Sequence, residues 1–320
     1  SKGITCIMIS HKLNEVSRVA DNITVIRDGK TIETIQREQD APIDENRIIK
    51  GMVGRELTNL YPERHATIGD TVLEVKDWTV YDENEPTRKR LKNISFNVRA
   101  GEVVGFSGLM GAGRTELAMS LFGHSYGVNS SGKIFKQGKE ITIPTVQSAI
   151  DQKIAYVPED RKTYGLVLIN DIKWNMTLAS LGSRFSERSV LKQDDEIRAA
   201  EDYRSRINIK TNSITQPVES LSGGNQQKLC LAKAFCLEPD LLFVAEPTRG
   251  IDVGAKALVL EAIRTLNREK GVTVVMISSE LEELRSACDR IAVVFQGKVA
   301  HVLQPSEDPA EFALYMAGVK

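Results

Sequence analysis

Two glycine-containing segments carry residue types that could bind phosphate. The first, residues 108–115, reads Gly-Leu-Met-Gly-Ala-Gly-Arg-Thr and follows a short apolar strand predicted at 103–106. In such a loop, backbone amides and the positive end of the following helix surround phosphate oxygens, and a Cβ would obstruct that approach. The residues expected to contact phosphate are Gly108, Gly111, Ala112, Gly113, Arg114 and Thr115. The Thr115 hydroxyl would also bind Mg²⁺.

The second segment, residues 221–228, reads Leu-Ser-Gly-Gly-Asn-Gln-Gln-Lys. It opens a helix predicted over 226–237, which ends before Pro239. The Ser222 hydroxyl and the amides of Gly223 and Gly224 would form a cluster of donors at a helix N-terminus, suited to a γ-phosphate offered by another domain. An ordinary serine N-cap would explain Ser222, but not the residues after it.

A carboxylate is expected at the end of a central strand. Residues 241–245 and 272–277 are continuous apolar runs of the kind found in buried parallel strands, and an amphipathic helix is predicted between them at 257–266. Glu246 directly follows the first run, and the carboxyl edge of an open α/β sheet is where such folds place chemistry.

The remaining periodicities predict the elements around these motifs. Residues 72–80 and 91–98 alternate as strands, and residues 116–122 form the helix after the phosphate loop. Residues 194–206 predict a charged helix with a solvated face.

An internal repeat indicates two copies of one domain type. Residues 4–16 closely match residues 272–284, and the offset of 268 persists to Gly29 and Gly297. One register kept through a strand, a helix and a hairpin indicates a tandem duplication. We therefore expect residues 1–50 to be the end of a first copy, 51–70 a linker and 71–320 a second copy.

The composition is that of a globular protein. The 320 residues are enough for about two domains, and the formal net charge of −1 gives no electrostatic reason to expect nucleic acid as a partner. We find neither an apolar stretch of about twenty residues nor a signal-peptide pattern, so any membrane attachment is expected through partners. The four cysteines lack metal-ligand spacing and are expected to be reduced core residues: Cys6, Cys230, Cys236 and Cys288.

The order of the motifs resembles that of ATP-binding cassette (ABC) ATPases. The resemblance implies ATP and Mg²⁺ as ligands. It also implies an α/β P-loop NTPase fold with a mostly parallel core sheet, an antiparallel β subdomain and a helical subdomain. The family's signature sequence, which closes over the nucleotide held by another domain, corresponds here to Leu221, Ser222, Gly223, Gly224, Asn225 and Gln226.

The resemblance also implies roles for single residues. Glu246 would polarise the attacking water, and Asp252 would belong to the loop that communicates across the dimer. Glu159 stands where the family usually has a glutamine that contacts Mg²⁺ and the membrane partner. Ser279 stands in place of a γ-phosphate-sensing histidine, whereas its repeat partner His11 keeps that histidine without a phosphate loop of its own.

Adenine stacking is expected from Tyr81, with Trp78 as the other candidate, although either ring could instead belong to the core. The residue before Glu246 is normally an aspartate that holds Mg²⁺ through water, and here it is Ala245. This departure predicts weaker retention of the metal.

The wording of these motifs is similar to that of the tandem ATPase subunits of bacterial monosaccharide importers, whose second domain commonly carries the equivalents of Arg114, Glu159 and Ser279. The resemblance implies a peripheral subunit on the cytoplasmic face of the membrane that hydrolyses ATP to energise sugar import. Its partners would be permease transmembrane subunits, a second nucleotide-binding domain and, indirectly, a periplasmic sugar-binding protein. Residues 158–168 would lie near the groove for the permease's coupling helix. The alternative is a weakly catalytic domain whose signature completes the other domain's active site.

Overall fold

The computed structural model describes residues 4–9, 13–27, 29–37, 43, 45–53, 67–251 and 253–320. It contains two compact units, one of Ser1–Pro62 with Gly250–Leu258 and the other of Glu63–Arg249 with Val259–Lys320. Each unit has an apolar core of its own.

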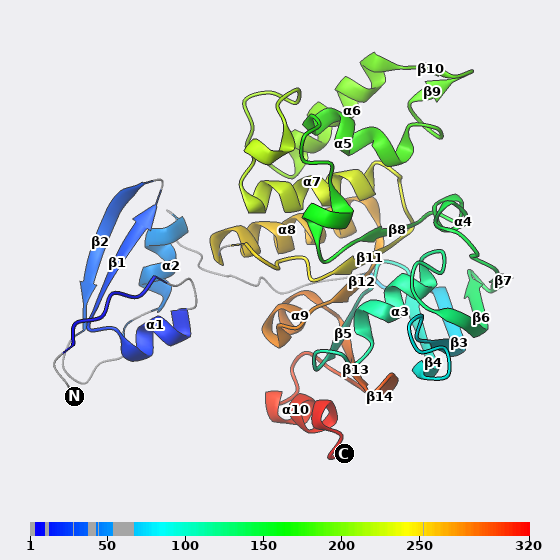
Figure 1. Ribbon diagram of the computed structural model, residues 1–320, viewed down its shortest axis with the longest axis horizontal. Helices are drawn as coiled ribbons and strands as arrows, with labels where there is room; N and C mark the ends of the chain where they lie inside the picture. The colour runs from blue at the N-terminus through cyan, green and yellow to red at the C-terminus, as the bar shows by residue number, and fades with distance from the viewer. Residues whose placement is uncertain are drawn as a thin grey trace. The chain divides into compact units, whose positions relative to one another are not determined.

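The larger unit is built on a six-stranded sheet of order β14-β13-β5-β12-β11-β8 (Figure 1). Its strands are β5 (Val103–Gly108), β8 (Ile154–Val157), β11 (Leu241–Ala245), β12 (Thr273–Ile277), β13 (Arg290–Phe295) and β14 (Lys298–Leu303). All neighbouring pairs are parallel except β13 and β14. Every residue of β5, β11 and β12 is buried, which explains their continuous apolar sequences. The predicted parallel core is confirmed.

A second sheet is antiparallel, with order β4-β3-β6-β7. Its strands are β3 (Thr71–Tyr81), β4 (Lys89–Arg99), β6 (Val128–Lys136) and β7 (Lys139–Ile141). Trp78 and Leu91 of this sheet share one apolar cluster with Phe106 of β5 and Leu117, so the two sheets close over a common core. The expected antiparallel subdomain is confirmed.

Helices cover the core sheet and form a separate helical part, as predicted. They are α3 (Arg114–Leu121), α4 (Val146–Asp151), α5 (Ile172–Thr177), α6 (Gln193–Arg206), α7 (Gly223–Phe235), α8 (Val253–Lys270), α9 (Leu281–Ala287) and α10 (Pro309–Ala317). Figure 1 shows α5, α6 and α7 grouped together, with the short strands β9 (Ser186–Glu187) and β10 (Val190–Leu191) beyond them. Short helical turns occupy Arg161–Gly165 (η1, a π-turn), Leu178–Ser180 (η2) and Val218–Ser220 (η3). Helix α6 has a solvated face, but Ala199, Ala200 and Tyr203 are buried.

The smaller unit repeats four elements of the larger one in the same order. It contains α1 (Leu13–Val19), β1 (Asn22–Arg27), β2 (Lys30–Gln36) and α2 (Glu45–Val53). The first three begin 268 residues before α9, β13 and β14 respectively. Even the irregularity recurs, since the register shift between Val25 and Ile26 has its counterpart between Val293 and Val294.

One expected strand of the smaller unit does not form. Residues 4–9 match β12 in sequence but have no regular structure, and Ile4, Ile7 and Ile9 are exposed. Strand β12 is bonded on one side by β11 and on the other by β5, whereas the sheet of the smaller unit, in the described residues, contains β1 and β2 alone. A strand without neighbours leaves its backbone groups unpaired. Cys6 is therefore exposed, contrary to expectation, while Cys230, Cys236 and Cys288 are buried.

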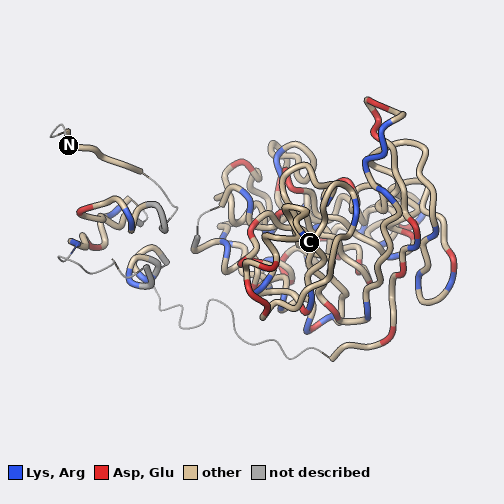
Figure 2. Tube along the Cα trace, turned by 90° about the horizontal axis from the view of Figure 1, so that it is seen from below, with Lys and Arg blue, Asp and Glu red and all other residues tan. Residues whose placement is uncertain are grey.

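The charged residues of 67–320 are mixed in sign. Figure 2 shows Lys and Arg interspersed with Asp and Glu along the trace. Among the described residues, no helix combines the length and the apolar character that crossing a bilayer requires.

Helix α7 carries a buried cation. Lys228 is 3% exposed, and its Nζ donates to the carbonyl of Asn208 at 2.8 Å. Burial lowers the pKa of Lys228 to about 8, and the positive charge of Lys210 acts in the same direction. The charged form is thus held in the fold at a cost, offset in part by the bond to Asn208.

Close approach of the turn between β13 and β14 to strand β4 makes Gly297 sensitive to substitution. Gly297 has φ +77°, and a Cβ there would lie 2.1 Å from the Arg90 carbonyl oxygen. Gly138 has φ +76° with no atom within 4 Å of its Cβ position. Gly138→Ala should cost about 1 kcal/mol for the left-handed backbone, and Gly297→Ala at least about 2 kcal/mol more because of the clash. Urea unfolding measures both, and equal losses would contradict the packing.

The burial of Lys228 should make stability depend on alkaline pH. The folded pKa near 8 lies below the ordinary 10.5, so the unfolded chain binds more protons between these values and stability rises with pH there. From about pH 7.5 to about pH 10, the free energy of unfolding of the wild type should rise on the order of 2 kcal/mol more than that of Lys228→Met. The exposed Lys139→Met is the control and should track the wild type. Parallel curves for Lys228→Met and the wild type would rule out this account.

Candidate functional site

The predicted phosphate loop connects the central strand β5 to helix α3. Gly113 is the N-cap of α3 and no side chain caps the helix, so its first-turn amides are open to an external acceptor. The loop lies close to β13, since a Cβ on Gly108, which has φ +150°, would stand 2.4 Å from the Val294 carbonyl oxygen. Leu109 and Met110 at the tip are exposed. This geometry suits an anion held by backbone amides.

The side chain of Arg114 turns inward. It is 8% exposed, its Nη1 donates to the Ser278 carbonyl at 2.6 Å, and its Nη2 lies 3.8 Å from Glu246 Oε1. Burial lowers the pKa of Arg114, and the carboxylates of Glu246, Glu116 and Glu159 oppose that shift. Arg114 therefore joins the end of β12 to the end of β11, and the proposed contact with phosphate would compete with Glu246.

Glu246 and Ser279 are brought together at the carboxyl edge of the sheet. Glu246 Oε2 accepts from the Ser279 amide at 3.0 Å and from the Ser279 hydroxyl at 2.9 Å. Glu246 has φ +45°, an uncommon conformation for a residue other than glycine and one that is frequent at functional sites. Glu246 is 9% exposed, and both donors set the orientation of its carboxylate.

A second buried carboxylate, Glu283 of α9, supports this edge and was not singled out from the sequence. Its oxygens accept from the hydroxyls of Ser278, at 2.9 Å, and Thr248. The two hydroxyl residues flank the catalytic candidates, Thr248 two residues after Glu246 and Ser278 directly before Ser279. The sequence could not single out Glu283, because Glu280 and Glu282 lie close to it in the chain and are of the same residue type. Only the packing of α9 shows that Glu283 is the buried one.

Two oxygen-bearing side chains, those of Thr115 and Glu159, lie together beside the phosphate loop and could contribute ligands to a divalent cation. The Thr115 hydroxyl donates to Glu159 Oε2 at 3.5 Å, and Glu159 Oε1 lies 3.2 Å from Arg249 Nη1. Ala245 is fully buried in the apolar cluster that contains Ala112. No group of three or more His, Cys, Asp or Glu side chains in the described part of the chain could hold a metal ion. The oxygens of Thr115 and Glu159 are of the kind that Mg²⁺ prefers as ligands.

The signature segment forms a separate donor site at the start of α7. Ser222 is exposed, is the N-cap of α7, and accepts from Asn225 Nδ2 at 3.0 Å. Asn225 Oδ1 accepts from the Lys210 amide at 3.0 Å. Gln226 Nε2 donates to the Leu221 carbonyl at 3.2 Å. The side chains of this segment therefore fix the serine and leave the amides of Gly223 and Gly224 at the helix start.

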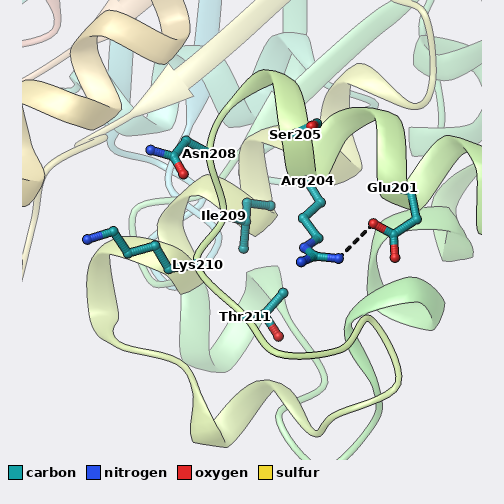
Figure 3. Close-up of a pocket in the computed structure, with 7 residues that line it drawn as sticks. All are labelled: Glu201, Arg204, Ser205, Asn208, Ile209, Lys210 and Thr211. Atoms are coloured by element: carbon teal, nitrogen blue, oxygen red, sulfur yellow. Dashed lines mark hydrogen bonds and ion pairs between the residues drawn. The ribbon is translucent and has the colours of Figure 1, made fainter.

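A cavity of about 490 Å³ adjoins this segment at Lys210, whose amide donates to Asn225. Figure 3 shows it between the C-terminal turn of α6 and the chain that follows. It is lined by Glu201, Arg204, Ser205, Asn208, Ile209, Lys210 and Thr211. Arg204 pairs with Glu201 at 2.8 Å, so the lining is partly self-neutralised.

The aromatic candidates have different environments. Trp78 is buried, and its Nε1 donates to Ser120 Oγ at 3.0 Å, which makes it a core residue. Tyr81 ends β3, is partly exposed, and has Lys89 Nζ 5.8 Å from its ring centroid. Of the two, Tyr81 has the more accessible ring. Asp252 and His11 lie outside the residues that the structure describes.

Known proteins resemble the chain in sequence and in fold. It is 51% identical over 310 residues to the L-arabinose transport ATP-binding protein AraG of Geobacillus stearothermophilus, covering 97% of this chain and 60% of that protein. It is 47% identical over 315 residues to the xylose import ATP-binding protein XylG of Thermoanaerobacter pseudethanolicus, covering 98% and 61%. The chain thus spans about three fifths of the length of these relatives.

Solved structures support the fold alone, since their sequence identity is low. CbiO1 of Clostridium perfringens, part of an ABC transporter complex, superposes with a TM-score of 0.63 at 21% identity, covering 78% of this chain and 96% of that one. The cassette MJ0796 bound to ADP and Pi superposes with a TM-score of 0.61 at 19% identity, covering 74% of this chain and 100% of that one.

Residues 91–249 match the family model described as ABC transporter. The chain therefore contains an ATP-binding domain of the ABC transporter family.

Proposed function

We propose that this chain is the part of a monosaccharide importer's ATPase subunit that binds and hydrolyses ATP at residues 108–115. The observation that carries the proposal is the junction of Arg114, Glu246 and Ser279 at the ends of three adjacent parallel strands, directly beside an uncapped helix start. The names of two relatives support import of a monosaccharide, since one is an L-arabinose transport ATP-binding protein and the other a xylose import ATP-binding protein. The proposal names no particular sugar, because an ATPase subunit of this kind does not contact the transported sugar.

Each residue of the junction has a definite task in the proposed reaction. Mg²⁺, when bound near Thr115, would neutralise charge on the phosphates. Glu246 accepts the proton of a water whose oxygen attacks the γ-phosphorus while the bond to the bridging oxygen of ADP breaks. Ser279 occupies Oε2, so Oε1 is the oxygen that must face the water, and Arg114 stands beside it. Movement of Arg114 toward the phosphates would both free Oε1 and stabilise the transferred group.

The partners follow from the same proposal. A permease would dock at residues 158–168, where Tyr164 is 77% exposed, and the neighbouring Ile169 is exposed to the same extent. The signature around Ser222 would close over ATP held by a second nucleotide-binding domain, and a periplasmic sugar-binding protein would act through the permease. Such a subunit works at the cytoplasmic face of the membrane, bound through the permease.

A second candidate function is a weakly catalytic domain whose signature completes the partner domain's active site. Two observations favour it. Ala245 offers no carboxylate where the family holds Mg²⁺ through water, and Arg114 already pairs with Glu246. The Ser222 site is intact in either case.

Turnover by the two-domain protein with its permease separates the two functions. If this domain hydrolyses ATP, Glu246→Gln should lower its contribution to turnover about 100-fold or more, because the proton acceptor is lost. Ser222→Ala should lower turnover in both functions, since it removes a donor that serves the other nucleotide. The exposed Ser220→Ala, two residues earlier, is the control. A wild-type rate in Glu246→Gln would leave only the second function, and a wild-type rate in Ser222→Ala would contradict both.

Restoring the missing carboxylate should link stability to the metal. Ala245→Asp places a charge in a fully buried apolar cluster, so without Mg²⁺ it should cost about 3 kcal/mol or more. Mg²⁺ with an ATP analogue should then raise the melting temperature of the variant more than that of the wild type. Ala245→Ser, which adds a polar group without charge, is the control. An equal thermal shift in variant and wild type would show that the carboxylate does not reach the metal.

A further inference from the structure

A buried guanidinium outside the reacting groups contacts both the signature segment and the turn that follows Glu246. Arg161 is 9% exposed and begins the π-turn η1, just after β8. Asp160 is the N-cap of this turn, and its carboxylate accepts from the amides of Lys162 and Thr163. The backbone that carries Arg161 is therefore fixed locally, so its long side chain has a defined origin.

The guanidinium holds two segments at once. Nη1 donates to the Arg249 carbonyl at 3.0 Å, and Nε lies 3.3 Å from Gln226 Oε1. Arg249 closes the turn after the strand, since its amide donates to the Glu246 carbonyl at 3.1 Å. Gln226 in turn donates to the carbonyl of Leu221, the residue before Ser222. One planar group thus connects the turn at Glu246 to the start of α7.

The same turn is connected to the phosphate loop. The side chain of Arg249 lies 3.2 Å from Glu159 Oε1, and Glu159 Oε2 accepts from the Thr115 hydroxyl. Polar contacts therefore run without interruption from Thr115 through Glu159, Arg249 and Arg161 to Gln226. The contacts of Arg161 carry a geometric requirement, because Arg161 and Gln226 are buried and a buried polar group that loses its partner costs free energy. The ion pair of Arg249 with Glu159 is open to solvent, with side chains 62% and 37% exposed, so Glu159 can exchange this partner for another at little cost.

A second set of contacts joins η1 to α7. The Gly165 carbonyl, at the end of η1, accepts from Lys233 Nζ at 2.9 Å. A Cβ on Gly165 would lie 2.8 Å from Cys230 Sγ, so the turn is packed directly on the helix. With Arg161 on Gln226 at one end and Gly165 on Lys233 at the other, a displacement of η1 displaces α7.

We infer that Arg161 is a positioning residue that makes the signature at the start of α7 respond to nucleotide bound at the phosphate loop. The inference rests on the proposed binding of nucleotide at residues 108–115. When a nucleotide and its metal draw the Thr115 hydroxyl and Glu159 toward them, Arg249 loses its partner and its turn shifts. Arg161 passes that shift to Gln226, because its planar donors bind both acceptors in one geometry. Lysine keeps the charge but cannot hold two acceptors in that way.

Hydrogen exchange on this chain tests the coupling. The probe is a non-hydrolysable ATP analogue with Mg²⁺, and exchange is followed by mass spectrometry in peptides covering residues 222–231. In the wild type the analogue should change the exchange of these amides. In Arg161→Lys the analogue's Kd should stay within about threefold of the wild-type value, while its effect on α7 falls about threefold to thirtyfold.

Two further variants keep the test decisive. Arg184→Lys is the matched control, because Arg184 donates to the Cys236 carbonyl at the opposite end of α7, and it should respond like the wild type. Gln226→Met cuts the same contact from the helix side and replaces Arg161→Lys if that variant does not fold. A double variant should lose no more of the response than either single one.

The outcomes separate this inference from the proposed function. Analogue binding with an unchanged α7 response in Arg161→Lys or Gln226→Met overturns the role of Arg161, as does binding to the wild type without any response in α7. Failure of the wild type to bind the analogue overturns the nucleotide site itself, and the coupling with it.

Discussion

The interaction on which the site depends is the set of contacts made by one carboxylate, that of Glu246. Strands β5, β12 and β11 are neighbours and parallel, so the residues that follow them meet at one edge of the sheet. Glu246 follows β11 and accepts from Ser279, which follows β12, while Arg114, which follows β5, lies beside it. The negative charge is thereby placed where donors from two other segments converge, and it holds those segments together.

Two interactions compete for Arg114 at this junction, and the competition bears on function. Arg114 can neutralise Glu246 or bind phosphate, and in the structure it takes the first role while also donating to the Ser278 carbonyl. Burial in a site of low dielectric strengthens such a contact. The proposed ATPase requires Arg114 to move, whereas the proposed structural domain does not. The same pairing therefore underlies both candidate functions, and their difference is a matter of which partner the guanidinium prefers when nucleotide is present.

The internal repeat shows which elements form from local sequence alone and which need segments that are distant in the chain. The hairpin of β1 and β2 reproduces that of β13 and β14, including the position of the register shift, because a hairpin supplies its own pairing partner. Residues 4–9 share the apolar pattern of β12 and remain irregular, because a parallel strand depends on segments distant in the chain.

The sequence by itself determined the types of element, the phosphate loop, the signature segment and the acid at the end of β11, since glycine spacing, periodicity and apolar runs are local properties. It did not reveal that Arg114 turns toward Glu246, that Trp78 is a core residue, or that Glu283 and Arg161 are buried among the site residues. Those facts depend on which side chains lie within a few ångströms after folding. Residues such as Arg161 and Gln226 are far apart in the chain, and their spacing carries no record of the contact. Only the tertiary structure decided it, because a hydrogen bond depends on distance and direction in space.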